Sequence, residues 1–264
     1  MKQLYNTEEA LERVSELISS SERILFITGA GISADSGLPT YRGIGGLYND
    51  GLTEEGISIE EALSGSMMRE RPDVTWKYLW KIGSACHKAV PSKAHEVISL
   101  IQNMKPDTWV LTQNIDGLHI AANTTNMIEI HGNIFSLHCI ECGRKKNYDE
   151  LILEFQDKLV FPPICSLCGG IIRPDVVLFG EQLPSEAMTK FYDIIDNQID
   201  LVISIGTSGL FSYIVEPVNI ANNRCKPTVE INPDITDISY LFKYRIEMKA
   251  AEAMGKILER LALS

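Results

Sequence analysis

The sequence contains no apolar run close to the roughly 18 residues that a membrane-spanning helix needs. Basic residues are scarce: 24 lysines and arginines stand against 35 aspartates and glutamates, which gives a net charge of −11. This excess of negative charge argues against general binding to a nucleic-acid backbone. The first residues are polar and acidic, so we expect no signal peptide. We therefore expect a cytoplasmic protein without direct nucleic-acid or membrane contacts, and we expect it to act as a monomer.

Cysteine is uncommon, and internal repeats and low-complexity tracts are missing. Six cysteines in a cytoplasmic chain favour metal ligands or free thiols over a disulfide framework. With 264 residues, of which 45% are hydrophobic, the chain can bury a sizeable core in one or two domains.

Short apolar runs alternate with helical patterns along most of the chain. Continuous apolar strands alternating with helices predict an α/β fold, with a parallel sheet covered by helices on both faces. The predicted strands are residues 23–28, 108–112, 127–130, 176–179, 200–205 and 227–231, and the clearest helices are 6–20, 92–104, 184–198 and a last one from Ala250 to Leu261.

Two segments interrupt this alternation and look like insertions. Residues 44–91 read as loop and helices, and residues 136–173 carry four cysteines with little apolar periodicity. We expect these two segments to form a small domain, and residues 1–43, 92–135 and 174–264 to form the large one.

A glycine turn follows the first predicted strand. Gly29-Ala30-Gly31 opens a G-x-G-x-x-A pattern that ends at Ala34. Such glycines let the backbone approach a pyrophosphate, whose charge the following N–H groups and a helix dipole can hold; the alternative is that they only shape the turn. A hydride-transfer enzyme is disfavoured, because Asp50, at a fitting distance for ribose recognition, lies in a predicted loop.

Polar residues follow two further predicted strands. Gln113, Asn114 and Asp116 come directly after residues 108–112, and ligands bind at the carboxyl ends of strands in open α/β sheets. Amides and a carboxylate suit hydroxyls and a carboxamide, whereas a simple turn capping the next helix would account for only one of the three. His131 and Gly132 follow the next strand; histidine is the side chain best suited to accept a proton near neutral pH, although a structural role is the commoner one.

Small or polar groups also end the two late strands, where the riboses of a nucleotide would lie. They are Gly206-Thr207-Ser208 and Asn232. Neither group is distinctive by itself.

The cysteines form two C-x-x-C pairs, Cys139–Cys142 and Cys165–Cys168, each followed by a glycine. Such paired knuckles predict a tetrahedral zinc held by four thiolates, and a site closed by four sulfurs is structural. The alternative is a cluster of reduced thiols without metal. Cys86 and Cys225 have no partner in sequence, and we expect ordinary buried thiols there.

In combination and in order, these stretches resemble the sirtuin family of NAD-dependent protein deacylases. The elements that carry the resemblance are T-G-A-G-I-S-A-D-S-G-L-P-T-Y-R-G, T-Q-N-I-D-G-L-H, I-H-G-N, the two knuckles, R-P-D-V-V-L-F-G-E, G-T-S and I-N-P, from Thr28 to Pro233.

The resemblance implies a Rossmann-like domain, a small domain made of a zinc ribbon and a helical insertion, and a cleft between them for NAD and an acyl-lysine peptide. NAD is then consumed: the acyl oxygen attacks the nicotinamide ribose, nicotinamide leaves, and a histidine helps a ribose hydroxyl attack the resulting imidate. The products are lysine, nicotinamide and O-acyl-ADP-ribose.

The resemblance also assigns roles to residues of this sequence. His131 would be the general base, with Asn114 beside the nicotinamide ribose. The peptide would add a strand to Val176, Val177, Leu178, Phe179 and Gly180. The implied NAD contacts are Gly29, Ala30, Gly31, Ala34, Tyr41, Arg42, Gln113, Asn114, Ile115, Asp116, Gly206, Thr207, Ser208 and Asn232.

The sequence departs from the family pattern at four places. Met248 stands near a position where glycine is common, so no contact is assigned to Lys249 or Ala250. Tyr41 stands where most members have phenylalanine, and the run 209–217 is longer than usual. Residues 76–82 lack the tyrosine-x-x-arginine pair of members that prefer negatively charged acyl groups, so we expect succinyl-lysine not to be the preferred substrate.

Two other functions fit parts of the same pattern. The same NAD pocket could serve a mono-ADP-ribosyltransferase or an NAD hydrolase. A non-enzymatic zinc ribbon that binds nucleic acid or protein is suggested by Arg144-Lys145-Lys146, but the net charge argues against it.

Overall fold

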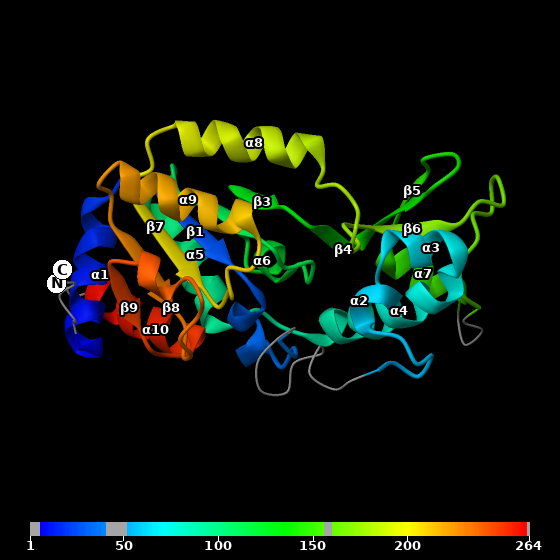
Figure 1. The fold of residues 1–264 in the computed structure, drawn as a ribbon, viewed down its shortest axis with the longest axis horizontal. Coiled ribbons are helices and arrows are strands. Elements are labelled where there is room, and N and C mark those ends of the chain that lie inside the picture. The colour runs from blue at the N-terminus through cyan, green and yellow to red at the C-terminus, as the bar shows by residue number, and fades with distance from the viewer. Residues whose placement is uncertain (1–5, 41–51, 156–159, 263–264) are drawn as a thin grey trace.

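The computed structural model describes residues 6–40, 52–155 and 160–262. Within these ranges, six parallel strands form one sheet in the order β3-β2-β1-β7-β8-β9 (Figure 1). The strands are β1 (Ile24–Thr28), β2 (Trp109–Thr112), β3 (Met127–Glu129), β7 (Leu201–Ile205), β8 (Thr228–Ile231) and β9 (Tyr244–Ile246). This order runs outward from β1 in both directions, as in the dinucleotide-binding α/β folds, and ligands bind in such sheets where the order reverses. The predicted α/β fold is therefore confirmed.

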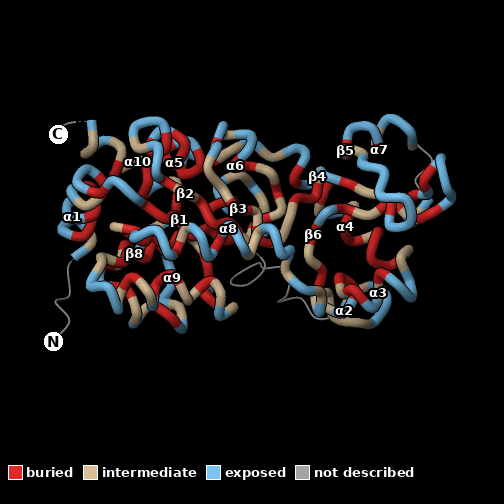
Figure 2. Tube along the Cα trace, turned by 90° about the horizontal axis from the view of Figure 1, so that it is seen from above, coloured by how far each residue is buried: buried red, intermediate tan, exposed pale blue. Residues whose placement is uncertain are grey.

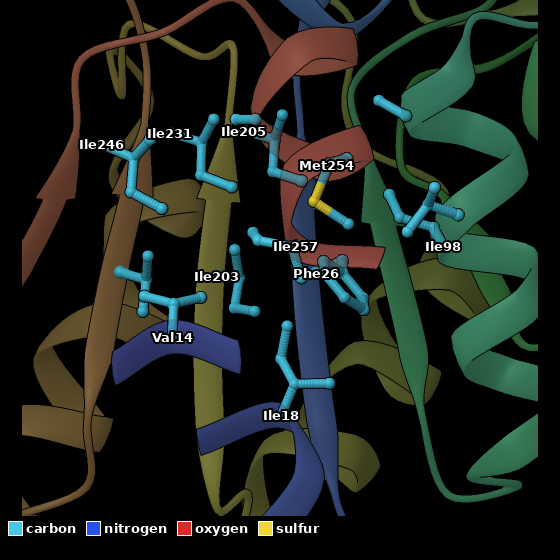
Figure 3. Packing of buried hydrophobic residues seen from close by; sticks show 14 of the residues in the cluster. Val14, Ile18, Phe26, Ile98, Ile203, Ile205, Ile231, Ile246, Met254 and Ile257 are labelled. Atoms are coloured by element: carbon cyan, nitrogen blue, oxygen red, sulfur yellow. The ribbon is translucent and has the colours of Figure 1, made fainter. Parts of the chain in front are cut away.

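Helices cover both faces of the sheet because the strands are apolar on both sides. In β1, Phe26 belongs to a core with α1 (Thr7–Ser20), α5 (Lys93–Met104) and α10 (Ala250–Leu261). Ile27, on the opposite face, belongs to a core with α8 (Ser185–Asp196) and α9 (Ser212–Asn223). Figure 3 shows the first of these cores, with Val14 and Ile18 of α1 and Met254 and Ile257 of α10 against the strands.

The first helix begins where the sequence predicts. The side chain of Asn6 accepts a hydrogen bond from the N–H of Glu9 at 2.9 Å, and the carboxylate of Glu9 accepts one from the N–H of Asn6 at 3.1 Å. This reciprocal cap satisfies two N–H groups that a helix start would otherwise leave unpaired.

The smaller part of the molecule joins a three-stranded antiparallel sheet to a group of helices (Figure 1). Trp76 is fully buried between them, and its Nε1 donates a hydrogen bond to the backbone oxygen of Ile172 at 2.8 Å. The two insertions therefore share one core, and buried positions run through both parts of the molecule (Figure 2). The elements are β4 (Gly132–Cys139), β5 (Lys145–Asn147), β6 (Ile172–Val176), α2 (Ile59–Ala62), α3 (Gly65–Glu70), α4 (Pro72–Lys88) and α7 (Tyr148–Phe155).

One strand prediction was wrong, and one strand of the large sheet was not predicted. Residues 176–179 are not a strand of the parallel sheet: β6 ends at Val176, pairs antiparallel with β4, and the following residues leave it. The edge strand β9 was missed, because its three residues include Arg245, whose charge pairs with the buried Glu230 of β8 at 3.0 Å. No helix in the described ranges has both the length and the apolar character needed to cross a bilayer.

Candidate active site and metal centre

A cavity of about 840 Å³ lies at the carboxyl ends of the central strands and extends to the smaller part of the molecule. It is lined by the turn after β1, the loop after β2, the turns after β7 and β8, and the segment after β6. The predicted residues on its wall are Gly29, Ala30, Gly31, Ala34, Gln113, Asn114, Ile115, His131, Val176, Val177, Leu178, Phe179, Gly180, Gly206, Thr207, Ser208 and Asn232.

The glycine turn packs directly against the turn after β7. A Cβ on Gly31 would lie 2.6 Å from the Cα of Gly206, so glycine is required by close approach of two backbones. The chain then forms short 3-10 turns, Ala30–Ile32 and Ala34–Ser36, and no α-helix begins there. The part of the sequence prediction that invoked a helix dipole was therefore wrong, and any phosphate contact would come from local N–H groups.

The amide side chains after β2 hold this turn in place. The Nδ2 of Asn114 donates to the backbone oxygen of Gly29 at 3.1 Å and to the hydroxyl of Ser33 at 3.2 Å. The Nε2 of Gln113 donates to the hydroxyl oxygen of Thr207 at 2.8 Å. Both side chains also line the cavity, so they join three strand ends at one place.

Asp116 does not itself line the cavity, and its contact with NAD stays a prediction. Its carboxylate is buried and accepts hydrogen bonds from the hydroxyl of Ser33 at 2.7 Å and from the N–H of Leu118 at 3.0 Å. Burial raises the pKa of Asp116, while these two hydrogen bonds act in the opposite direction. Its observed contacts position the glycine turn and the start of α6 (Leu118–Ala121).

His131 faces the cavity with a defined hydrogen-bond arrangement. Its Nδ1 lies 2.8 Å from the backbone oxygen of Gln113, and because a carbonyl only accepts, Nδ1 carries the proton. Burial lowers the pKa of His131 below its ordinary value of 6.5, while the bond to Gln113 acts in the opposite direction. Near neutral pH the imidazole is therefore uncharged, and Nε2 has the free electron pair.

Gly132 lets the small sheet begin immediately after this histidine. Its φ is +80°, and a Cβ there would lie 1.8 Å from the backbone oxygen of Asp175. Glycine is therefore required here because the backbone of β6 approaches Gly132 closely.

Two aromatic residues of the site were missed by the sequence analysis. Phe211 and Tyr213 line the cavity, and the hydroxyl of Tyr213 lies 2.6 Å from Nε2 of His131. Both belong to the run after Ser208 that is longer than the family pattern, and that extra length was the one signal that could have drawn attention to them.

The turns after β7 and β8 meet at the wall of the cavity. The Nδ2 of Asn232 donates to the backbone oxygen of Thr207 at 3.3 Å, and Ser208 beside it is exposed. Lys249 and Ala250, to which the sequence analysis assigned no contact, also line this cavity. Tyr41 and Arg42 lie outside the described residues.

The segment from Val176 to Gly180 is held on both sides. The N–H of Val177 donates to the backbone oxygen of His131 at 2.9 Å, and that of Phe179 donates to the backbone oxygen of Leu63 at 3.0 Å. A peptide that adds a strand here would therefore pair with backbone groups of this segment other than the N–H groups of Val177 and Phe179.

An ion pair closes this segment into a loop. Arg173 contacts both carboxylate oxygens of Glu181, at 2.7 and 3.0 Å, and also donates to the backbone oxygen of Val176. Glu181 in turn accepts from the N–H of Leu178 at 2.9 Å. Burial alone would raise the pKa of Glu181, but Arg173 and this N–H hold it below its ordinary value.

The four predicted metal ligands come together at the far end of β4. The sulfurs of Cys139, Cys142, Cys165 and Cys168 all lie within 4.8 Å of one another. The distance is 3.4 Å between Cys139 and Cys168, and 3.9 Å between Cys142 and Cys165. Zinc–sulfur bonds of about 2.3 Å in a tetrahedron require sulfurs roughly 3.8 Å apart, so the donor set fits one zinc.

The metal centre is separate from the cavity. Strand β4 begins beside His131 and ends at Cys139, and eight residues of strand span roughly 25 Å. A closed four-sulfur site at that distance fixes the fold of the small sheet and takes no part in the chemistry at His131.

Comparison with known proteins decides the family. The Sir2 family model matches residues 29–212, more than half of the chain. The chain belongs to the Sir2 family. This Sir2 protein is 45% identical, over 97% of its length, to NAD-dependent protein deacylase 2 of Pseudomonas aeruginosa, of which it covers 99%. It is 35% identical, over 90% of its length, to the NAD-dependent protein deacylase of Aquifex aeolicus, of which it covers 95%.

Solved Sir2 structures have the same fold as this Sir2 protein. One, solved to explain the mechanism and regulation of Sir2 enzymes, has a TM-score of 0.84 at 29% identity and covers 97% of this chain and 99% of the other. Another contains a deacetylated p53 peptide and 3′-O-acetyl-ADP-ribose, with a TM-score of 0.85 at 25% identity over 94% of this chain and 97% of the other.

The ion pair beside the cavity of this Sir2 protein gives a first prediction. Glu181→Gln keeps the shape of the side chain but leaves Arg173 half-buried without its counter-charge. We expect a loss of about 1–3 kcal/mol in the free energy of unfolding and a higher KM for peptide. Denaturant titration and steady-state kinetics measure both. The control is Glu186→Gln, at an exposed carboxylate on α8; equal effects of the two variants would contradict the positioning role.

Proposed function

We propose that this Sir2 protein is an NAD-dependent protein lysine deacylase, which transfers the acyl group of a modified lysine to ADP-ribose and releases nicotinamide. One observation carries the proposal: a single cavity joins the glycine turn after β1, the amides after β2, His131 and the segment after β6. The Pseudomonas and Aquifex relatives, which are named NAD-dependent protein deacylases, support it.

NAD is the co-substrate, and the residues around the cavity fit its parts. Gly29 and Gly31 would admit the diphosphate close to the backbone. Gln113, Asn114 and Ile115 would surround the nicotinamide ribose, where Oδ1 of Asn114 can accept from the carboxamide. Ser208 and Asn232 would hold the adenosine end.

His131 would act as the general base. Its neutral ring presents the electron pair of Nε2 to the cavity, because Nδ1 is fixed by the backbone oxygen of Gln113. After nicotinamide has left, a ribose hydroxyl gives its proton to this base, and its oxygen attacks the acyl carbon. The apolar wall formed by Phe211 and Leu178 helps to exclude water from that step.

We also propose the division into domains that the sequence suggests. Residues 1–43, 92–135 and 174–264 would form the NAD-binding domain, and residues 44–91 and 136–173 the small domain. The core shared around Trp76 supports this grouping of the two insertions.

A stoichiometry assay tests the proposed function. Purified protein with NAD and an acetyl-lysine peptide should form nicotinamide and deacetylated peptide in equal amounts. Neither product should form when NAD or the peptide is left out. Deacylation in the absence of NAD would contradict the proposal.

The environment of His131 predicts the pH dependence. A base must be neutral, and burial lowers the pKa of His131 below 6.5. Activity should therefore be full near pH 7 and fall only as the pH drops through this lowered value, so the acid limb of kcat/KM should lie below pH 6.5. Circular dichroism at each pH confirms that the protein stays folded. An acid limb centred above pH 6.5 would contradict this environment.

The wall of the cavity beside α4 predicts the acyl preference. Leu63, Leu79 and Ile82 line it, and the one cationic side chain among the described lining residues is Lys249, before α10. A succinyl carboxylate placed against Leu79 and Ile82 would lose water without gaining a counter-charge. We expect kcat/KM for acetyl-peptide to exceed that for succinyl-peptide by about tenfold or more, roughly 1.4 kcal/mol. The variant Ile82→Arg should reduce the ratio of these two kcat/KM values, because it supplies a counter-charge. Fastest turnover of succinyl-peptide by the unaltered protein would contradict the prediction.

A further inference from the structure

The hydroxyl of Tyr213 is hydrogen-bonded to Nε2 of His131, the nitrogen that must accept a proton in the proposed reaction. The two groups lie 2.6 Å apart, within the cavity wall. A ribose hydroxyl cannot give a proton directly to Nε2 while this contact is in place. The proton must therefore travel through Tyr213, or Tyr213 must move away.

The direction of the hydrogen bonds is fixed by the backbone oxygen of Gln113. That oxygen only accepts, so Nδ1 of His131 donates to it and Nε2 is an acceptor. Tyr213 therefore donates its single hydrogen to Nε2. Its oxygen retains acceptor capacity for a hydroxyl that enters the cavity.

The ring of Tyr213 is held by its neighbours. It stacks on Phe211 with ring centroids 5.4 Å apart and an interplanar angle of 12°. It also meets the ring of His131 edge-on at 6.0 Å, and it lies in the first turn of α9. These contacts favour a fixed hydroxyl over a side chain that swings out when NAD binds.

We propose that Tyr213 relays the proton from the ribose hydroxyl to His131, an inference that rests on the proposed deacylase function. The ribose O–H proton passes to the oxygen of Tyr213 as the hydroxyl proton of Tyr213 passes to Nε2. The ribose oxygen keeps the electron pair of the broken O–H bond and uses it to form the bond to the acyl carbon. Tyr213 ends neutral, and His131 ends as the imidazolium.

A neutral tyrosine suits this task. Burial raises the pKa of Tyr213 to about 12, so the side chain stays a hydroxyl at ordinary pH and can donate and accept at once. The relay needs no tyrosinate at any stage.

The variant Tyr213→Phe tests the relay because it keeps the stacked ring and removes only the hydroxyl. The kcat for deacylation should fall about 10- to 100-fold, less than the ~10²–10⁴ that general acid–base catalysis supplies as a whole. Acyl-peptide-dependent exchange of labelled nicotinamide into NAD should be largely unchanged, because nicotinamide leaves before the base acts. The control is Tyr192→Phe, at a half-exposed ring on α8, which should alter neither rate.

Two other results for Tyr213→Phe would overturn the relay. An unchanged kcat with a lower KM for NAD would mean that the hydroxyl only competes with the ribose for Nε2. Equal losses of exchange and deacylation would mean a structural role. Wild-type protein that releases no nicotinamide with acyl-peptide would instead overturn the proposed function, and the relay with it.

The double variant and the wild-type isotope effect give independent readouts. If the two residues act as one unit, adding Tyr213→Phe to His131→Ala should cause little further loss. Rates in mixtures of H₂O and D₂O should curve for the wild type, because two protons move together, and become linear for Tyr213→Phe. Additive losses with a linear wild-type plot would overturn the relay.

Discussion

His131→Ala is expected to lower kcat for deacylation by about 10²–10⁴-fold, the contribution of a well-placed general base. The variant removes Nε2 of His131, which can accept a proton because Nδ1 carries the proton of the neutral ring. Acyl-peptide-dependent nicotinamide exchange should suffer less, because that step precedes proton transfer. Single-turnover assays with separate readouts for nicotinamide and lysine measure both steps.

The matched control for this variant is His87→Ala. His87 lies on α4 with an exposed side chain and makes a 3.7 Å contact with Asp149. Its removal should leave kcat unchanged. Full deacylation by His131→Ala, in protein with a normal melting temperature, would reject the base assignment.

Loss of the metal is expected to have the largest effect on stability. Zinc in four-thiolate sites contributes on the order of 10 kcal/mol to the folding of small peptides, and here it would join the end of β4 to the segment that precedes β6. Cys165→Ser, or extraction of zinc from the intact protein by a chelator, should unfold the small sheet. Because β4 begins at Gly132 and β6 leads into Val176, the active site should be lost with it.

Three measurements follow the metal and its loss. Elemental analysis should give one zinc per chain, limited proteolysis should cut first within residues 136–173 after extraction, and deacylation should stop. The control is Cys225→Ser, which should retain zinc and activity. Cys225 lies outside the cluster and is exposed, so the sequence prediction of a buried thiol was wrong there, whereas Cys86 is buried as predicted. Full activity in zinc-free protein would contradict a structural role.

The strands of the large sheet could be predicted because each is apolar on both faces. Runs such as Leu201–Ile205 are buried throughout, so their sequence carries the signal. The segment 176–179 has the same composition for a different reason: Val176 and Leu178 pack in the core of the smaller part beside the cavity. Composition cannot separate these two kinds of burial.

The candidate site could be predicted where residues of a distinctive type follow a predicted strand or recur at a fixed spacing. Glycines, amides and the cysteine pairs are distinctive in kind and spacing. The structure brings the glycines and amides together at the cavity, and the cysteines together in a separate cluster. Tyr213 and Phe211 follow no pattern of spacing, and the start of α9 brings them to His131. Asp116 illustrates another limit, because the sequence does not reveal that its buried carboxylate accepts a hydrogen bond from Ser33.

The central claim is that the acyl group is transferred to ADP-ribose, and mass spectrometry of the nucleotide product tests it most directly. With NAD and an acetyl-lysine peptide, we predict that O-acetyl-ADP-ribose forms in the same amount as the deacetylated peptide. Bare ADP-ribose formed without loss of the acetyl group, or protein that carries ADP-ribose, would contradict the claim and favour an NAD hydrolase or a mono-ADP-ribosyltransferase.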